Sequence, residues 1–403
     1  MRVVIVGAGP AGAATGLLLA RAGADVTLVE RQSDFAREFR GEGLMPSGAD
    51  ALAQMGLGAE LDALPQSHVT HLRLWRDGVV LLELPVAAAG GDAPIRMVSQ
   101  PAMLEMLVAQ AGRYPSFRFE RGVTVRESLH TGGRVAGVHV ESTSGGRDLP
   151  TDLVIGADGR ASVLRRQAGL PEVSQTQTFD IIWCKVPMPV AWASEHAMNA
   201  FLGRGHAALC FRAWDDRLQI GWIIAKGAFG DLKRRGVDAW MAELAAHVGP
   251  VLGPHLLAHR GDVTHPFLLD VVCGRLERWT APGLLLLGDA AHPMSPVGAQ
   301  GINLALRDSL VAANHLGPLA AQPPDAAAID RATAAVERER MPEIVAIQRL
   351  QQMPPALMFR ESWWSGLVLR ALPWLVRSGI APLVLGAAIR RITRGVVPVR
   401  LQA

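Results

Sequence analysis

The sequence predicts an α/β fold in which one layered domain is built from separate segments of the chain. An apolar strand pattern at residues 2–7 is followed by a helical pattern at 10–22 and a second strand pattern at 25–30. Such a unit, with β-branched strands buried on both faces, is typical of a parallel sheet covered by helices. Two further apolar strands, 153–156 and 284–288, each end in glycine. We therefore expect a three-layer, Rossmann-like domain that other structure interrupts.

The interrupting structure is predicted to be a domain of β-strands. Residues 68–85 alternate in hydrophobicity around an Asp77-Gly78 pair, which is typical of a hairpin turn, and residues 179–227 are also strand-rich. Further helices are expected at residues 48–64, 101–112, 236–248 and 301–315, and short strands at 117–155. We assign residues 1–67, 96–176 and 270–350 to the discontinuous Rossmann-like domain, 68–95 and 177–269 to the β-sheet domain, and 351–403 to a C-terminal helical region.

Composition excludes several classes of protein. A length of 403 residues and a hydrophobic content of 49% suit two or three subdomains with a large core. A net charge of +3 offers no electrostatic basis for binding nucleic acid. Three scattered cysteines without a C-x-x-C pair predict neither a disulfide framework nor a metal site, and fit a reducing cytoplasm. Glycines interrupt the apolar N-terminus at once, so no export signal is expected there.

The first glycine-rich segment has the spacing of a dinucleotide-binding turn. Gly7 permits the tight turn, Gly9 lets the backbone approach a pyrophosphate, and Gly12 lets the helix lie close to the strand. The N-terminus of that helix would face the phosphates with its dipole and free N–H groups. Glu30 ends the second strand, where a carboxylate binds the ribose of an unphosphorylated adenosine, as in FAD or NAD. No second G-x-G-x-x-G follows, which disfavours enzymes with two dinucleotide-binding folds.

Two later segments add polar groups to the same predicted edge. Asp158-Gly159 follows the strand at 153–156, and Asp289 follows the strand at 284–288. Asp289 is suited to binding hydroxyl groups such as those of a ribityl chain, although a helix N-cap is the alternative. The loop 296–303 then opens a long helix, whose N–H groups would favour the negative charge of a reduced flavin ring.

These segments resemble the fingerprints of the group A flavin-dependent monooxygenases, the p-hydroxybenzoate hydroxylase-like family. The likeness covers roughly residues 1–320, and residues 288–303 match its G-D-A-A-H motif and the loop that follows, more loosely in the second half. The resemblance implies one FAD, which NADH or NADPH reduces while docking without a Rossmann domain of its own. O2 would add at the flavin C4a, and the hydroperoxide would deliver one oxygen atom to a substrate bound by the β-sheet domain.

The resemblance also implies residue roles. The residues expected to bind FAD are Gly7, Gly9, Ala11, Gly12, Glu30, Arg31, Arg40, Gln100, Asp158, Asp289, Pro296, Gly301, Ile302 and Asn303. His292, Pro296 and Gly298 are expected to shape the catalytic site around the flavin ring, with no acid or base assigned among them. The alternatives are a surface salt bridge between Arg40 and Glu42 and a simple helix cap at Gln100. Arg160 belongs with Asp158 to the motif linked to both FAD and NAD(P)H.

We expect hydroxylation or epoxidation of a hydrophobic aromatic or isoprenoid small molecule in secondary metabolism. The loop 40–46 resembles that of squalene epoxidases. A tyrosine relay that deprotonates a phenol is not expected, because the one tyrosine, Tyr114, lies outside the predicted substrate layer. The alternatives are a geranylgeranyl reductase-like enzyme and a flavin-dependent halogenase. The halogenase is disfavoured because no lysine precedes Lys185 and the W-x-W-x-I-P motif is missing.

Two features leave two interpretations open. The tryptophans of the strand-rich stretch, Trp183, Trp192, Trp214 and Trp222, either form an apolar wall above the flavin or fill a sheet–helix core. The tail from about Pro354 has seven arginines against one acidic residue, and its longest uncharged run is 12 residues. A bilayer span needs about 20 residues. The tail therefore either caps the core with helices or makes peripheral contact with a membrane surface.

Overall fold

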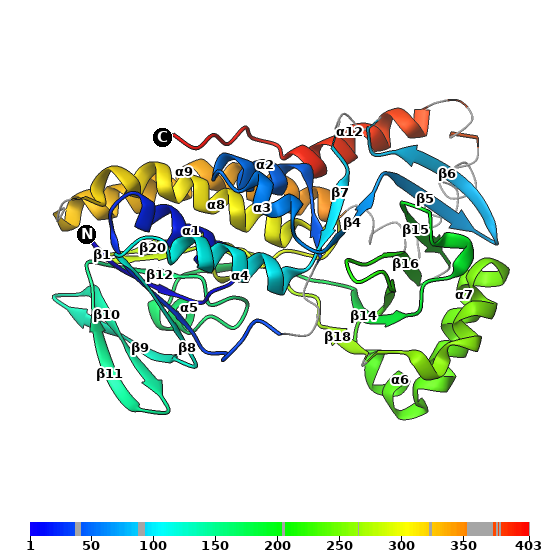
Figure 1. The fold of residues 1–403 in the computed structure, drawn as a ribbon, viewed down its shortest axis with the longest axis horizontal. Coiled ribbons are helices and arrows are strands. Elements are labelled where there is room, and N and C mark those ends of the chain that lie inside the picture. Colours follow the sequence, from blue (N-terminus) through cyan, green and yellow to red (C-terminus); the bar gives the residue numbers. More distant parts are fainter. Residues whose placement is uncertain are drawn as a thin grey trace.

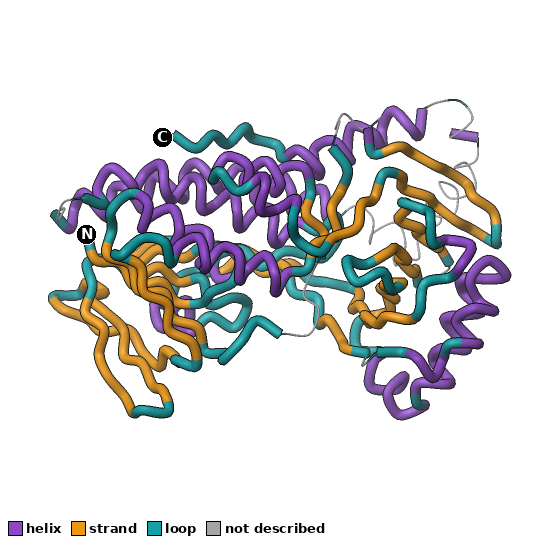
Figure 2. The backbone as a smooth tube through the Cα atoms, in the orientation of Figure 1, coloured by secondary structure: helices purple, strands orange, loops and turns teal. Residues whose placement is uncertain are grey.

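In the computed structural model, a mainly parallel sheet forms the centre of the Rossmann-like domain (Figures 1 and 2). The structure describes residues 1–36, 42–87, 93–203, 206–264, 266–321, 325–352, 374–375, 378 and 380–402. The strands of this sheet, in spatial order, are β20 (Thr280–Ala281), β21 (Leu284–Leu286), β12 (Leu153–Gly156), β1 (Arg2–Val6), β2 (Asp25–Glu30) and β8 (Phe117–Arg121). All described neighbours are parallel except the edge pair β20–β21.

Helices cover one side of this sheet and a second sheet lies on the other (Figure 1). The helices are α1 (Pro10–Arg21), α2 (Pro46–Gln54), α3 (Gly58–Asp62), α4 (Gln100–Ala111), α8 (Gln300–Leu316) and α9 (Ala326–Gln351). The short helix α5 (Val163–Ala168) lies on the other side and contacts β9. Helix α1 contacts α4 and α8, and α8 contacts α2 and α9. The second sheet has the antiparallel order β11 (Gly145–Pro150), β10 (Arg134–Ser142), β9 (Thr124–Thr131). The domain therefore has three layers, as the sequence predicts.

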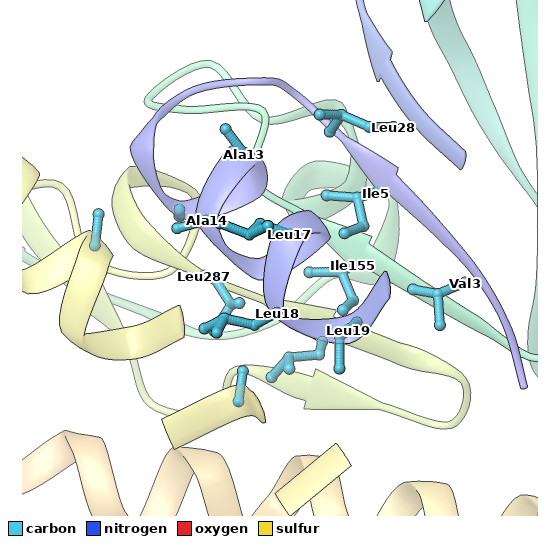
Figure 3. Close-up of a cluster of buried hydrophobic side chains, with 14 of the residues drawn as sticks. Val3, Ile5, Ala13, Ala14, Leu17, Leu18, Leu19, Leu28, Ile155 and Leu287 are labelled. Carbon is cyan, nitrogen blue, oxygen red and sulfur yellow. The ribbon is translucent and has the colours of Figure 1, made fainter. Parts of the chain in front are cut away.

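The core of this domain lies between α1 and the sheet. Leu17 and Leu19 of α1 are buried with Ile5 of β1 and Ile155 of β12 (Figure 3). Truncating one such buried leucine to alanine costs about 2–5 kcal/mol of stability. Small residues on α1, such as Ala13, let the helix lie close to the strands. This packing fixes the N-terminus of α1 against the end of β1.

A seven-stranded sheet forms the interrupting domain. Its spatial order is β18 (Phe267–Leu269), β14 (Phe179–Val186), β17 (Leu218–Ala225), β16 (Ala207–Arg212), β15 (Ala197–Leu202), β5 (His71–Arg76), β6 (Val79–Pro85). The turn between β5 and β6 has positive φ at both Asp77 and Gly78, as a two-residue hairpin turn requires. Helices α6 (Phe229–Arg235) and α7 (Val237–Ala258) follow β17, and α7 covers one face.

Short strands join the two large sheets. A three-stranded sheet contains β3 (Gly43–Leu44), β7 (Ile95–Val98) and β4 (Gln66–Val69), and β13 (Glu172–Gln175) pairs with β19 (Cys273–Leu276). Helix α12 (Ile380–Arg394) contacts α2 and α9, and the chain after it runs back beside α2 (Figure 1). Within the described residues, no helix combines the length and the apolar character needed to cross a bilayer.

Most predicted strands and three of the predicted helices form within one or two residues of their expected bounds, but several other helices differ. The helix expected at 48–64 is divided into α2 and α3, because Gly56 adopts φ +82° and ends the first of them. Helices α5, α6 and α9 were not predicted, and α7 continues past a kink at Gly249 to Ala258, beyond the expected end at residue 248. The strands of the two large sheets fall inside the segments assigned to the two domains, whereas β4 runs across the boundary at residue 67. The domain boundaries themselves stay a prediction.

Candidate active site

The three glycine-rich segments meet at one edge of the central sheet. Because β1, β12 and β21 are parallel neighbours, their carboxyl ends lie side by side. Backbone hydrogen bonds continue past the strands: Ala157 N–H donates to the Val6 carbonyl at 2.8 Å, and Leu287 N–H donates to the Gly156 carbonyl at 2.9 Å. Ligands of open α/β sheets bind outside this edge. The sequence motifs therefore form one contiguous site.

The three glycines of the first segment have different structural roles. Gly7 has φ +98°, and a Cβ on it would collide with the Ala157 backbone; a Cβ on Gly12 would collide with the Gly7 carbonyl. Gly9, by contrast, has ordinary backbone angles, and a Cβ on it would meet no protein atom within 4 Å. No side chain caps the N-terminus of α1, where Gly9 is the N-cap. Open space before uncapped helical N–H groups is the setting in which a pyrophosphate binds.

Glu30 is fixed beside this turn. Its carboxylate is buried and accepts hydrogen bonds from Ala8 N–H at 2.9 Å and from Gln32 N–H at 3.1 Å. A carboxylate held by backbone donors keeps lone pairs for further hydroxyl donors. Arg31, the next residue, is exposed.

The second and third segments are joined by ion pairing. Arg160 Nε lies 3.3 Å from Asp289 Oδ2, and Arg165 donates to the carbonyl of Asp289 at 3.5 Å. Asp289 makes no capping hydrogen bond at the 3₁₀ turn Gly288–Ala290, so the N-cap interpretation is wrong. Asp158 Oδ2 accepts from Val163 N–H at 2.8 Å at the start of α5, while its Oδ1 is buried without a partner among the described residues. Burial raises the pKa of Asp158.

The loop that precedes α8 is held in shape by amide side chains. Asn303 accepts a hydrogen bond from Met45 N–H at 2.8 Å and donates to the Gly43 carbonyl at 3.2 Å, which joins α8 to β3. Gln300 donates to the carbonyls of Gly298 at 2.7 Å and Ile392 at 3.0 Å. Gly298 and Ala299 have positive φ, so the loop turns sharply before the helix.

This loop lies beside Asp289. A Cβ on Gly301 would stand 3.9 Å from Asp289 Oδ1, and Ile302 is half-buried in the first turn of α8. Pro296 begins the turn, and the Ala299 N–H donates to its carbonyl at 3.0 Å. The uncapped N-terminus of α8 therefore opens close to the Asp289 carboxylate.

His292 belongs to a buried charge network behind the loop. Its Nε2 lies 2.7 Å from Asp308 Oδ2, and Arg340 Nε donates to Asp308 Oδ1 at 2.8 Å. The contacts with His292 and Arg340 hold the pKa of Asp308 below its usual value despite the opposing effect of complete burial. Glu343 pairs with Arg340 and with Arg307, whose Nη2 lies 2.9 Å from Glu343 Oε1. Asp308 is therefore ionised at neutral pH, and His292 Nε2 must carry the hydrogen.

Comparisons with known proteins decide the family. A family model described as a FAD binding domain matches residues 1–343. The chain belongs to the FAD-dependent monooxygenases of group A. It is an oxidoreductase that uses FAD with NAD(P)H and O2 on a small-molecule substrate.

Individual relatives agree with this assignment. The chain is 33% identical over 315 residues to 6-methylpretetramide 4-monooxygenase from Streptomyces rimosus. The aligned region covers 77% of this chain and 73% of that protein. It is 26% identical to squalene epoxidase 3 from Arabidopsis thaliana, over 79% of this chain and 60% of that one. The crystal structure of p-nitrophenol 4-monooxygenase PnpA from Pseudomonas putida DLL-E4 superposes with a TM-score of 0.80 at 17% identity, covering 98% of each chain, and shows the shared fold.

Several features of the residues at this sheet edge show whether the site suits FAD. The open space at Gly9 and the two uncapped helix N-termini provide room and N–H donors for a pyrophosphate and a ring. The orphaned Asp158 Oδ1 is a buried acceptor that lacks a donor within the described chain. These features agree with a dinucleotide at this edge.

Two residues expected to contact the flavin, Arg40 and Gln100, lie away from the three glycine-rich segments in sequence. Arg40 lies outside the described residues. Gln100 is the first residue of α4, and the helix is capped by Ser99, whose side chain accepts from Ala102 N–H at 3.4 Å, so a cap at Gln100 is wrong. Glu42, the alternative partner of Arg40, is buried and pairs with Lys185.

The tryptophans divide between the two faces of the seven-stranded sheet. Trp183 lies on the face that contacts Val297 and Ala299 of the α8 loop. Trp192 and Trp222 are buried on the opposite face, under α7. For these two the sheet–helix core interpretation holds: Trp222 on β17 points to the face away from the loop, and Trp192 ends the 3₁₀ turn Val190–Trp192.

The sequence interpretation missed one group of polar residues in the monooxygenase. Glu42 on the segment before β3, Lys185 on β14 and Asp215 in the turn after β16 form a partly buried cluster. They are distant in sequence, and no motif connects them. The only available signal was the position of Lys185, a single cation among the apolar residues of β14.

Proposed function

We propose that this monooxygenase hydroxylates a hydrophobic aromatic small molecule. The observation that carries the proposal is the apolar face of the seven-stranded sheet, where Trp183 and Phe211 are in edge-to-face contact within a cluster against which Val297 and Ala299 of the α8 loop pack. Flat apolar ligands are bound by such aromatic surfaces. The similarity to 6-methylpretetramide 4-monooxygenase supports the same substrate class. An isoprenoid is the second candidate, supported by the similarity to squalene epoxidase 3.

We assign the residues that hold FAD from the site geometry. Gly9 and the N-terminus of α1 would bind the pyrophosphate, and Glu30 the adenosine ribose. Asp289 would bind hydroxyls of the ribityl chain, and the loop 296–301 would border the flavin ring. Asp158 and Arg160 would complete the edge, in the motif that the family resemblance links to both FAD and NAD(P)H.

When bound, FAD accepts a hydride from NAD(P)H and activates O2 for transfer of one oxygen atom. The protein's contribution is positioning and electrostatics. The dipole at the N-terminus of α8 favours negative charge on the nearby ring. The apolar residues around Trp183 exclude water from the reacting atoms. His292 and Asp308 keep the loop in place from behind.

Turnover in labelled oxygen tests the proposed function. The FAD-loaded enzyme is supplied with NADH or NADPH and a panel of lipophilic phenols, anthraquinones and prenylated aromatics in ¹⁸O2, with products detected by mass. Incorporation of one labelled oxygen atom is expected. Consumption of NAD(P)H with a reduced double bond and no labelled product would instead identify a reductase of the geranylgeranyl type.

Contact with a membrane surface is proposed as a second property of the same enzyme. Trp374 is 65% exposed in the described part of the tail, and α12 carries Arg390, Arg391 and Arg394 near its end. Exposed tryptophan together with arginines favours the lipid–water interface. Sedimentation with vesicles of anionic and of neutral lipids tests this: binding to anionic vesicles that is lost in Trp374→Ala supports it, and equal recovery in the supernatant with both vesicles contradicts it.

A further inference from the structure

A cluster of charged side chains runs from the interior to the surface where β3, β14 and the β16–β17 turn meet. Lys185 Nζ lies 2.9 Å from Glu42 Oε1 and 3.0 Å from Asp215 Oδ2. The exposed fractions of the side chains rise along the row, from 4% for Glu42 to 13% for Lys185 and 27% for Asp215. The three residues therefore form a continuous polar connection between a buried carboxyl group and solvent.

The buried end of this connection faces the flavin side of the sheet. Ile181, Trp183 and Lys185 are two residues apart along β14, so their side chains point to the same face of the sheet. This is the face that contacts the α8 loop. Glu42 directly precedes Gly43, where a Cβ would lie 2.8 Å from the Ala299 Cβ. Glu42 is thus placed at the junction of the sheet face and the loop that borders the ring.

One oxygen of Glu42 makes no hydrogen bond of good geometry in the described chain, and the Trp214 indole is the side-chain N–H donor beside the carboxyl group. Oε1 pairs with Lys185, but Oε2 is buried and unpartnered. Burial raises the pKa of Glu42 from 4.5 to about 7; Lys185 opposes this effect, Asp215 adds to it, and the Trp214 indole, as a side-chain donor, also opposes it. Buried polar atoms without a partner are uncommon and call for an explanation. An acceptor with a pKa near neutrality suits a group that gains and loses a proton in catalysis.

The other charges near the cluster are held by other partners. Arg217 donates to the carbonyls of Lys185 at 3.4 Å and Asp262 at 2.7 Å. Arg96, on the strand that pairs with β3, donates to Asp62 at 2.5 Å. Lys185 is therefore the cation that, among the described residues, directly contacts the Glu42 carboxyl group.

A second carboxylate–lysine–carboxylate row on the same sheet shows that an orphaned oxygen is not a necessary result of this arrangement. Lys226 pairs with Asp180 at 2.8 Å and with Asp270 at 2.5 Å. Here the buried carboxylate is fully bonded, because Asp180 also accepts from the N–H groups of Gly227 and Val271. Hydrogen bonds from Lys226 and the backbone hold the pKa of Asp180 below its usual value, against burial. The two rows differ in the free oxygen of Glu42.

We propose that Glu42 is the general base of the hydroxylation, taking the proton from a hydroxyl group of the aromatic substrate, and that Lys185 and Asp215 conduct that proton to solvent. The proposal rests on the proposed function and names its proton acceptor. The substrate O–H bond breaks, its electron pair stays on the phenolate oxygen, and Glu42 Oε2 becomes protonated. Rotation of the Glu42 carboxyl group then turns this proton towards Lys185, which takes it as it gives one of its own to Asp215.

The remaining steps balance the reaction. The phenolate directs electron density to the ring carbon that receives the oxygen atom from O2, with NAD(P)H as the reductant. That carbon then loses its hydrogen as a proton, and the ketone oxygen gains one, so the aromatic ring is restored with a second hydroxyl group. The proton released through Asp215 offsets the proton consumed when O2 is reduced by NAD(P)H.

The first test is the pH dependence of turnover in Glu42→Gln, which keeps the side-chain shape. With a phenolic substrate from the oxygen-labelling panel, kcat/KM of the wild type should rise with pH around 7. General-base catalysis contributes about 10²–10⁴-fold. We expect a loss of that size in the variant, no rise near pH 7, and FAD binding and reduction by NAD(P)H within about twofold of wild type. Glu42→Asp should recover part of the rate, and Asp180→Asn, the matched control, should keep the rise.

The second test needs no turnover. Infrared difference spectra of the FAD-loaded protein, titrated from pH 5 to pH 9 (about two units either side of neutrality), should show a protonated carboxyl band that disappears near pH 7. The band should be missing in Glu42→Gln and present in Asp180→Asn. An unchanged pH profile in Glu42→Gln, or a Glu42 carboxyl that is ionised throughout the titration, would overturn the assignment. If no labelled product forms with wild type, the proposed function fails, while the infrared titration still decides the protonation of Glu42.

Discussion

His292 Nε2 lies 2.7 Å from Asp308 Oδ2, and this buried pair joins the third glycine-rich segment to α8. The same carboxylate oxygen accepts the Gly288 N–H at 3.2 Å, so Asp308 holds the segment by its backbone as well as by its histidine. Arg340 balances the charge of Asp308 from α9. The position of Asp289 at the sheet edge therefore depends on the buried carboxylate of Asp308, which holds the segment from behind.

Replacing Asp308 by asparagine should destabilise the protein by about 3 kcal/mol at pH 7, because Arg340 and its neighbours lose a buried counter-charge. The pKa of Asp308 is held below its ordinary value of 3.8, so its stabilising effect is present above that pH and is lost as the pH falls through the lower folded value. Urea unfolding should show a gap between wild type and Asp308→Asn that is constant near neutrality and narrows below pH 3.8. A gap that does not change with acid would contradict the ionic role.

Substitutions of the glycines in the first segment can distinguish an effect on folding stability from an effect on FAD affinity. Gly9→Ala adds a methyl group where no protein atom lies within 4 Å, so thermal stability without FAD should stay within about 0.5 kcal/mol of wild type. FAD affinity should fall at least about tenfold, because the methyl group occupies the space next to the helix N-terminus. The measurement is fluorescence titration of the apoprotein with FAD.

Gly12→Ala is the control for this experiment. Its Cβ would collide with the Gly7 carbonyl, so the variant should lose stability whether or not FAD is added. If Gly9→Ala binds FAD as tightly as wild type, the pyrophosphate does not lie at this turn.

The sequence was sufficient for features that depend on local pattern. The turn at Gly7–Gly12, the strand ending at Glu30 and the Asp77-Gly78 hairpin are specified by neighbouring residues, and the structure has them as expected. Features that depend on distant residues were not accessible. The ion pair between Glu42 and Lys185 joins positions in different sheets, and the burial of Asp308 follows from its contacts with α9. Neither relationship produces a motif or a regular residue spacing in the sequence.

Asp289→Ala should abolish FAD retention while the protein still folds. The side chain is 33% exposed and its partner Arg160 also bonds to the Asp270 carbonyl at 3.3 Å, so its removal leaves no unpaired buried charge. The loss should appear as a colourless protein after gel filtration, with an unchanged circular dichroism spectrum. Asp270→Ala is the matched control: its exposed side chain is removed but its carbonyl remains, so FAD should be retained. Near-normal FAD affinity in Asp289→Ala would mean that the hydroxyl-binding role is misassigned.

Glu42→Gln should stabilise the enzyme above neutral pH, although it removes an ion pair. A carboxyl group whose pKa is raised by folding binds its proton more tightly in the native state than in the unfolded state. Its contribution to the free energy of unfolding is therefore complete below pH 4.5 and is lost as the pH rises to about 7. A shift of this size corresponds to about 3 kcal/mol. Lys185 keeps Asp215 as its counter-ion in the variant, so no uncompensated charge remains. Urea unfolding at a series of pH values should therefore show wild type and variant alike near pH 4.5, with the variant more stable by up to about 3 kcal/mol at pH 8. Equal stability of the two proteins across this range would show that the buried carboxyl group of Glu42 is not held against ionisation, and the general-base assignment would lose its energetic support.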